Sequence, residues 1–142
     1  MSILLTGGAG YIGSHTAVEL ISSGYEVIIA DNFSNSSPKV LERIETITGK
    51  KVKNYVIDVS DREALKVVFR ENKIDAVIHF AGYKAVGESV KVPLEYYRNN
   101  IDCAISTLEV MKAFGTKRFI FSSSATVYGE AAEIPYREDM KT

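Results

Sequence analysis

The chain has 142 residues, of which 46% are hydrophobic and 25% charged, so one globular domain of ordinary size is expected and a disordered, collagen-like or coiled-coil chain is excluded. Lys and Arg total 17 against 18 Asp and Glu, a net charge of −1, which offers no basic surface for nucleic acid or an anionic membrane. The single cysteine, Cys103, excludes an internal disulfide or a cysteine metal cluster and favours a reducing compartment. The first 18 residues are too polar for a signal peptide or a membrane span. We expect a cytoplasmic protein without a metal site.

The first elements read as a strand, a helix and a second strand. An apolar run at residues 3–5 predicts the first strand, and a helical pattern follows from Ile12 to Ser23. Gly24 stands where a helix needs a left-handed residue after its C-terminus. The run at 27–30 is apolar throughout, as expected for a strand covered on both faces.

The middle of the chain repeats this alternation. Ser37 and Pro38 read as the N-cap and first residue of a helix that Gly49 ends. Residues 55–57 predict a third strand. Ser60 and Glu63 have capping-box spacing at the start of the next helix, which ends near residue 72, and residues 76–80 form the fourth strand.

The longest predicted helix runs from Pro93 to Gly115 and leads into a fifth strand at residues 119–121. Its main apolar stripe predicts one buried face: Leu94, Tyr97, Ile101, Ala104, Leu108 and Met111. A second stripe predicts that another face is buried too: Tyr96, Cys103 and Val110. Five apolar strands separated by helices predict an α/β protein with a doubly wound parallel sheet, a Rossmann-like fold, with residues 1–142 as one domain.

A glycine-rich turn lies between the first strand and the first helix. Gly7, Gly10 and Gly13 have the Gly-x-x-Gly-x-x-Gly spacing. Gly7 would allow the tight turn, Gly10 would let a pyrophosphate approach the backbone, and Gly13 would let the helix pack closely. The free amides at the helix start, those of Tyr11 and Ile12, would bind the phosphates. The strand before and the helix after predict a dinucleotide site rather than a turn without a ligand.

Asp31 follows the second strand, where its carboxylate can accept hydrogen bonds from the adenosine ribose hydroxyls. The same charge repels a 2′-phosphate, and residues 32–37 contain no arginine that could bind one. We therefore predict NAD rather than NADP as the cofactor.

Other candidate residues are less informative by themselves. Asp58 ends the third strand and could bind the adenine amino group or simply form a turn. Ala81 and Gly82, after the fourth strand, could let a cofactor pass. His79 reads as a packed core residue, and Cys103 as a packing residue. His15 reads as a helix-surface or packing histidine.

Longer motifs carry a resemblance that covers the whole chain: Thr6-Gly-Gly-Ala-Gly-Tyr-Ile-Gly13, Asp31-Asn32, His79-Phe-Ala-Gly82, Lys84-Ala-Val-Gly-Glu-Ser-Val90, Pro93-Leu-Glu-Tyr-Tyr97 and Phe121-Ser-Ser-Ser-Ala-Thr-Val-Tyr-Gly129. The chain resembles the extended short-chain dehydrogenase/reductase family and, within it, the UDP-sugar 4-epimerases. A sugar-nucleotide dehydratase would carry an acidic pair where Ala125 and Thr126 stand.

The resemblance implies a role for each matching residue. The cofactor-binding residues would be Gly7, Gly10, Tyr11, Ile12, Gly13, Asp31, Asn32, Asn35, Ser36, Asp58, Val59, Phe80, Ala81, Lys84, Asn99 and Ser122. Ser124 would be the catalytic hydroxyl, and Lys84, Ser122 and Ser124 would contact the substrate. The implied reaction interconverts UDP-galactose and UDP-glucose, in galactose metabolism, through a 4-keto intermediate. A hydroxyl at Ser124 can hydrogen-bond the C4 oxygen as it becomes a carbonyl.

The family's base is a tyrosine with a lysine four residues later, and no such pair occurs in these 142 residues. We therefore expect an incomplete form of the fold, lacking later strands and the substrate domain, that is inactive alone. The second stripe of the long helix resembles a dimerisation helix of the family and implies a homodimer. Two alternatives remain: another NAD-dependent sugar-nucleotide epimerase or dehydratase, and a non-catalytic NAD-sensing module.

Overall fold

The computed structural model describes residues 1–129 and 134–142 and has a five-stranded parallel sheet at its centre. The strands are β1 (Ser2–Thr6), β2 (Glu26–Asp31), β3 (Lys53–Val56), β4 (Ala76–His79) and β5 (Arg118–Phe121). They lie in the order β3-β2-β1-β4-β5, and every pairing is parallel. The chain therefore builds outward from β1 first on one side and then on the other. The predicted doubly wound parallel sheet is confirmed.

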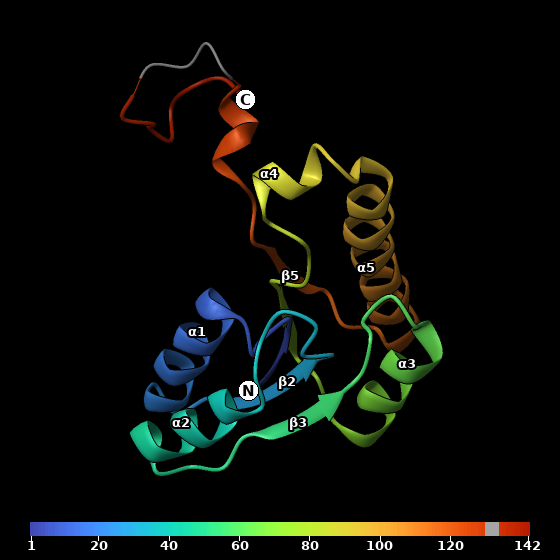
Figure 1. Ribbon diagram of the computed structural model, residues 1–142. Coiled ribbons are helices and arrows are strands. Elements are labelled where there is room, and N and C mark those ends of the chain that lie inside the picture. Colours follow the sequence, from blue (N-terminus) through green and yellow to red (C-terminus); the bar gives the residue numbers. More distant parts are fainter. Residues whose placement is uncertain (130–133) are drawn as a thin grey trace.

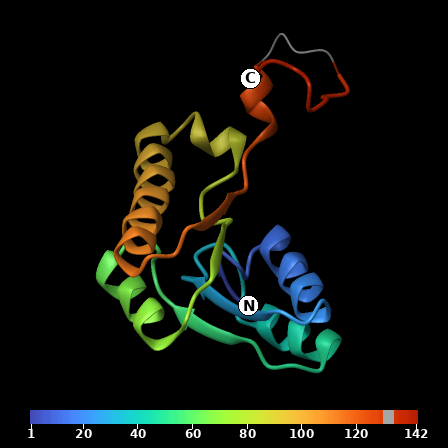
Figure 2. The ribbon, with the colours of Figure 1, turned by 180° about the vertical axis from the view of Figure 1, so that it is seen from behind.

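Helices cover both faces of the sheet, as Figures 1 and 2 show from opposite sides. α1 (Tyr11–Ser22) packs with α2 (Lys39–Thr48) on one face, and α3 (Arg62–Glu71) packs with α5 (Pro93–Phe114) on the other. A one-turn helix, α4 (Val86–Ser89), precedes α5, and a 3₁₀ turn, η1 (Ala125–Tyr128), follows β5. Neither short element was predicted, since four residues carry too little periodicity to detect.

Each face of the sheet has its own apolar core, because successive side chains of a strand point to opposite faces. Leu4, Ile28 and Val77 pack toward α3 and α5. Leu5 and Ile29 pack toward α1 and α2. This is why the central strands are apolar at every position rather than at alternate ones.

Glycines end three of the helices as predicted. Gly24, Gly49 and Gly115 have φ of +84°, +69° and +74°. After α1, Gly24 N–H donates to the Ile21 carbonyl and Tyr25 N–H to the Leu20 carbonyl, the pair of bonds of a Schellman motif.

Two predicted helix starts need correction. α2 begins at Lys39, so Pro38, although helical in φ and ψ, lies just before it, while Ser37 Oγ accepts from Lys39 N–H at 3.4 Å. The capping box at Ser60 was wrong. Asp61 caps α3 by accepting from the Glu63 and Ala64 amides, at 3.0 and 3.1 Å.

Ser60 instead turns back toward the end of β3, where its Oγ and N–H both donate to Asp58. The Glu63 carboxylate binds Lys66 rather than reaching back to the cap. A carboxylate one residue closer to the helix takes the cap because it accepts two charge-assisted bonds at once.

Of the two apolar stripes of α5, the second is buried as expected, but the main stripe is largely exposed. Tyr96, Cys103 and Val110, of the second stripe, are buried against the sheet and α3. In the main stripe Met111 is buried, but Leu94 is 80% exposed and Tyr97 66% exposed. Ile101 and Leu108 are about half exposed. The second stripe, from which a dimer was inferred, is therefore used inside the chain and is not available for dimerisation. The apolar face of α5 that remains uncovered belongs to the main stripe.

No helix in the part of the chain that the structure describes has both the length and the apolar content to cross a membrane.

Candidate functional site

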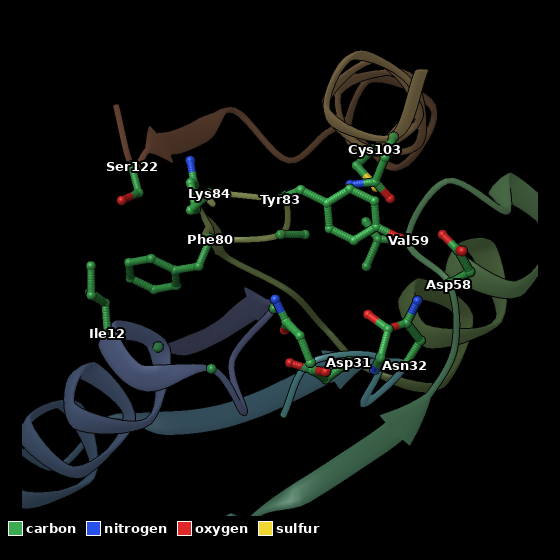
Figure 3. A pocket seen from close by; sticks show the side chains of 18 of the residues that line it. Ile12, Asp31, Asn32, Asp58, Val59, Phe80, Tyr83, Lys84, Cys103 and Ser122 are labelled. Carbon is green, nitrogen blue, oxygen red and sulfur yellow. The ribbon is translucent and has the colours of Figure 1, made fainter. Parts of the chain in front are cut away.

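A pocket of about 370 Å³ opens at the carboxyl ends of the strands. It lies where the chain order of the sheet reverses, between β1 and β4. Such switch points are the usual ligand sites of doubly wound sheets, and the volume is in the range of small-molecule sites. In Figure 3, Asp31, Asn32 and Asp58 lie toward one end of the pocket and Ile12, Lys84 and Ser122 toward the other.

The glycine turn brings the backbone of β1, α1 and β4 into close contact. Gly7 has φ +68°, and a Cβ there would lie 2.6 Å from the Ala81 nitrogen. A Cβ on Gly13 would lie 2.7 Å from the Gly7 carbonyl oxygen. Gly7 N–H also donates to the Ala30 carbonyl. Side chains at these positions would push the turn apart, so the glycines are needed for the shape of the pocket floor.

The N-terminus of α1 points its free amides at this floor. Gly10 precedes the helix without any side-chain cap, and the first turn holds no acidic residue. The first amides of a helix have no intrahelical acceptor and stand at the positive end of its dipole. This end of the pocket therefore suits an anionic group such as a pyrophosphate.

Asp31 ends β2 with its side chain in the pocket wall and is buried. Its Oδ2 accepts from Ala9 N–H at 2.9 Å, and its Oδ1 accepts from Phe33 N–H at 2.9 Å and Ser36 Oγ at 3.0 Å. Phe33 has φ +56°, a conformation that non-glycine residues rarely adopt. One carboxylate thus holds the glycine turn and the loop after β2. A carboxylate has about four acceptor positions, so it can take a further donor from a ligand.

Asp58 and Val59 follow β3 at the same end of the pocket. Asp58 Oδ1 accepts from Ser60 N–H at 2.9 Å and Ser60 Oγ at 2.7 Å, so it does form a turn. It also lines the pocket, and both alternatives for Asp58 are therefore compatible with its position. Val59 is buried and contributes apolar surface.

The opposite wall is the segment between β4 and α4. Phe80, Ala81, Gly82, Tyr83 and Lys84 all line the pocket. Asn99 and Cys103 contribute to the wall from α5, and Ser122 from the end of β5. Lys84 adds a positive charge beside the pocket, which favours an anionic ligand.

The structure brings together 15 of the 16 predicted cofactor residues around this one pocket. The exception is Ser36, which donates to Asp31 instead of lining the wall. Ser124 also lies outside the pocket. It caps η1, and its Oγ is 2.9 Å from Thr126 Oγ1 on an exposed turn away from the sheet.

His79 and Cys103 are packed, as expected. His79 is buried between Thr6 Oγ1, at 2.7 Å from its Nδ1, and the ring of Phe121, and its Nε2 has no partner among the described residues. Burial, assisted by the charge of Lys84, lowers the pKa of His79 to about 4, so the ring is neutral. Burial raises the pKa of the Cys103 thiol to about 11, which excludes a reactive thiolate at neutral pH. His15 lies on the surface of α1 beside Tyr11.

The sequence analysis did not predict several residues that the structure places at or beside the pocket. Ser34, Ile57 and Tyr83 line the pocket, and their only signal was closeness to residues already chosen. Asn100 contacts Tyr83 from 17 positions away, and no local pattern indicates it. In the described part of the chain, no cluster of three or more His, Cys, Asp or Glu side chains could hold a metal ion.

The fold and the site together define a dinucleotide-binding α/β protein. The model of the NAD dependent epimerase/dehydratase family matches residues 3–142. The chain belongs to this family.

Similar proteins are UDP-glucose 4-epimerases. That of Bacillus subtilis is 58% identical over 139 residues, covering 98% of this chain and 41% of its own length. That of Schizosaccharomyces pombe is 57% identical over 129 residues, covering 91% and 36%. The chain thus spans about two fifths of the length of the curated relatives it matches.

Solved structures similar to this chain are also UDP-glucose 4-epimerases. UDP-glucose 4-epimerase from Bifidobacterium longum, in complex with NAD⁺ and UDP, has a TM-score of 0.96 at 56% identity and covers all of this chain and 42% of that one. The enzyme from Stenotrophomonas maltophila, with bound NAD and formylated UDP-arabinopyranose, has a TM-score of 0.94 at 46% identity, with the same coverage.

Proposed function

We propose that the pocket binds NAD and that the chain is the NAD-binding part of a UDP-glucose 4-epimerase. The complete protein would interconvert UDP-galactose and UDP-glucose, as a step of galactose metabolism. The observation that carries the proposal is the pocket itself, with uncapped helix amides, a glycine floor and the buried carboxylate of Asp31 next to the glycine turn. The names of the similar proteins support it.

The residues present fit this cofactor. The amides of Tyr11 and Ile12, at the uncapped start of α1, would hold the pyrophosphate. Asp31, with Asn32, Asn35 and Ser36, would hold the adenosine ribose, and its charge would oppose a 2′-phosphate. Asp58 and Val59 would hold the adenine. The nicotinamide side would be bounded by Phe80, Ala81, Lys84, Asn99 and Ser122.

Bound NAD would supply a hydride acceptor for C4 of the sugar. The pocket residues would hold the cofactor in place and exclude water around it. Ser124 would donate a hydrogen bond to the C4 oxygen, which gains carbonyl character in the reaction, and Lys84 and Ser122 would contact the substrate. Ser124 follows β5, and the end of β5 reaches the pocket at Ser122.

The same proposal includes three broader points. Residues 1–142 act as one NAD-binding domain, the protein works in the cytoplasm, and it assembles as a homodimer. The composition and the single buried cysteine support the cytoplasmic location. The uncovered apolar face of α5 supports the homodimer.

Two measurements test the proposal. Calorimetric titration of the chain with NAD and with NADP tests the cofactor site, and NAD is expected to bind more tightly. Product analysis after incubating the complete protein with UDP-galactose tests the reaction, and UDP-glucose is the expected product. A dehydrated or reduced product would contradict the epimerase assignment, and no binding of NAD would contradict the site.

A further inference from the structure

The wall of the pocket between β4 and α4 has few hydrogen bonds of its own. Phe80 N–H still pairs with Thr6 in the sheet, and the turn of α4 begins at the Ala85 carbonyl. For the backbone between them, residues 81–84, the hydrogen bonds found within the described residues are the two at Tyr83. Both of these bonds involve the side chain of Asn100.

The Asn100 amide pairs with both backbone groups of Tyr83. Its Oδ1 accepts from Tyr83 N–H at 2.7 Å, and its Nδ2 donates to the Tyr83 carbonyl at 3.1 Å. A side chain with one acceptor and one donor side by side matches the two backbone groups of one residue. Asn100 lies on α5, so this pair ties the wall to the longest helix of the fold.

The same oxygen also orients a second residue of the pocket. Asn99 Nδ2 donates to Asn100 Oδ1 at 3.0 Å, and Asn99 lines the pocket. This bond fixes the orientation of the Asn99 amide, whose Oδ1 and second N–H have no partner among the described residues and can serve a ligand. Gly82 permits the approach: its φ is +149°, and a Cβ there would lie 3.1 Å from Asn100 Oδ1.

α4 has a separate attachment to α5. Tyr96 Oη donates to the Glu88 carboxylate. The ring of Tyr96 also packs against the ring of Tyr83 with centroids 5.2 Å apart, so without Asn100 the Tyr83 side chain would keep this contact while its backbone lost both hydrogen bonds. Loss of the Asn100 amide would therefore leave α4 tethered while releasing the backbone of residues 81–84. The effect should be confined to the pocket wall.

We propose that Asn100 is a positioning residue for the cofactor: it does not line the pocket, but it fixes the Tyr83 backbone and the Asn99 amide so that Lys84 and Asn99 face the ligand. This inference rests on the proposed NAD site. Without Asn100 the wall would have to be ordered when NAD binds, and that ordering would reduce the affinity.

The test compares two variants with a matched control. Asn100→Ala removes the side chain, and Asn100→Leu keeps its branched shape but removes all three of its hydrogen bonds. Thr116→Val is the control, because Thr116 Oγ1 donates to the Ile74 carbonyl at 2.9 Å, a bond of the same kind near the far end of α5 and outside the pocket. NAD affinity is measured by calorimetry, and backbone exchange by hydrogen–deuterium exchange of each variant without ligand.

Both Asn100 variants should bind NAD about tenfold more weakly than the unchanged chain, because the two hydrogen bonds to the Tyr83 backbone and the one from Asn99 are lost. They should also exchange the Tyr83 amide faster, whereas the control should lose stability but keep its NAD affinity and its Tyr83 protection. Normal NAD affinity in both Asn100 variants, or an equal loss in Thr116→Val, would overturn the role of Asn100 and leave the NAD site standing. Absence of NAD binding by the unchanged chain would overturn the proposed function, and this inference with it.

Discussion

The carboxylate of Asp31 at the end of β2 accepts a hydrogen bond from the backbone N–H of Ala9 at 2.9 Å. This bond joins the residue that would select the cofactor to the glycine turn that would hold its phosphates. The position of Asp31 therefore depends on the turn, and the shape of the turn depends on Asp31.

Replacing Asp31 by Asn should change cofactor selection and stability together. The amide keeps one acceptor oxygen but loses the negative charge, so NAD should bind about tenfold more weakly, while NADP, no longer repelled, should lose less. Unfolding free energy should fall by about 1–2 kcal/mol, because a buried N–H is left without an acceptor. Calorimetry and urea unfolding measure the two effects. An Asp31→Asn chain that still favours NAD to the original degree would contradict the role of the charge.

The packing at Gly13 predicts a clear difference between two glycine substitutions. Gly13→Ala places a methyl group 2.7 Å from the Gly7 carbonyl oxygen, so it should destabilise the fold by about 2–3 kcal/mol and abolish NAD binding. Gly87→Ala, in α4, meets no atom within 4 Å and should be neutral or stabilising by up to about 1 kcal/mol. Thermal unfolding with and without NAD compares them. Equal effects would show that close packing at Gly13 is unimportant.

The buried ring of His79 predicts a loss of stability in acid. Its pKa in the folded chain is about 4, below the ordinary value of 6.5, so between these values the unfolded chain binds a proton that the folded chain does not. The neutral ring of His79 therefore adds about 2–3 kcal/mol to the free energy of unfolding. This stabilisation is fully present above pH 6.5 and is lost as the pH falls toward 4. Urea unfolding from pH 7.5 to 4 measures it.

The control for this prediction is His79→Asn, which keeps a polar atom near Thr6 but cannot titrate. It should be less stable at neutral pH and should show a smaller decrease toward acid. If both chains lose the same free energy between neutral and acid pH, other groups are responsible.

The exposed apolar face of α5 predicts self-association. This face is formed by Leu94, Tyr97, Ile101, Ile105 and Leu108. A charged residue at its centre, as in Ile101→Glu, should weaken association and change the stability of the monomer by about 0.5 kcal/mol or less, since Ile101 is already half exposed. Sedimentation equilibrium over a range of concentrations measures the association. A strictly monomeric unchanged chain would contradict the use of this face.

Ser124 predicts a loss of catalysis without a loss of cofactor. In the complete protein, Ser124→Ala should lower kcat about a hundredfold or more, because the hydrogen bond to the C4 oxygen is strongest as the carbonyl forms. NAD affinity should stay within about twofold, since the loss is confined to the chemical step. Steady-state kinetics with UDP-galactose and NAD titration separate the two. A parallel loss of NAD affinity would assign Ser124 to the cofactor instead.

Much of the candidate site could be predicted from local sequence. The glycine spacing, the uncapped helix start and Asp31 all depend on residues close together in the chain, so their pattern is visible without a structure. The family resemblance added Phe80, Lys84 and Asn99 to the predicted site residues. The capping box at Ser60 failed because Asp61, one position on, competes for the same amides, and spacing alone does not decide such a competition.

The sequence by itself determined the alternation of strands and helices, the glycine turn and the acidic residue after β2, because hydrophobic periodicity and backbone freedom are local properties. Only the tertiary structure decided which stripe of α5 is buried, because both stripes are apolar and the choice depends on how the sheet and α3 meet the helix. It alone brought Asn100 to Tyr83, because a contact across 17 residues follows from the packing of α5 on the sheet and leaves no periodic trace in the sequence.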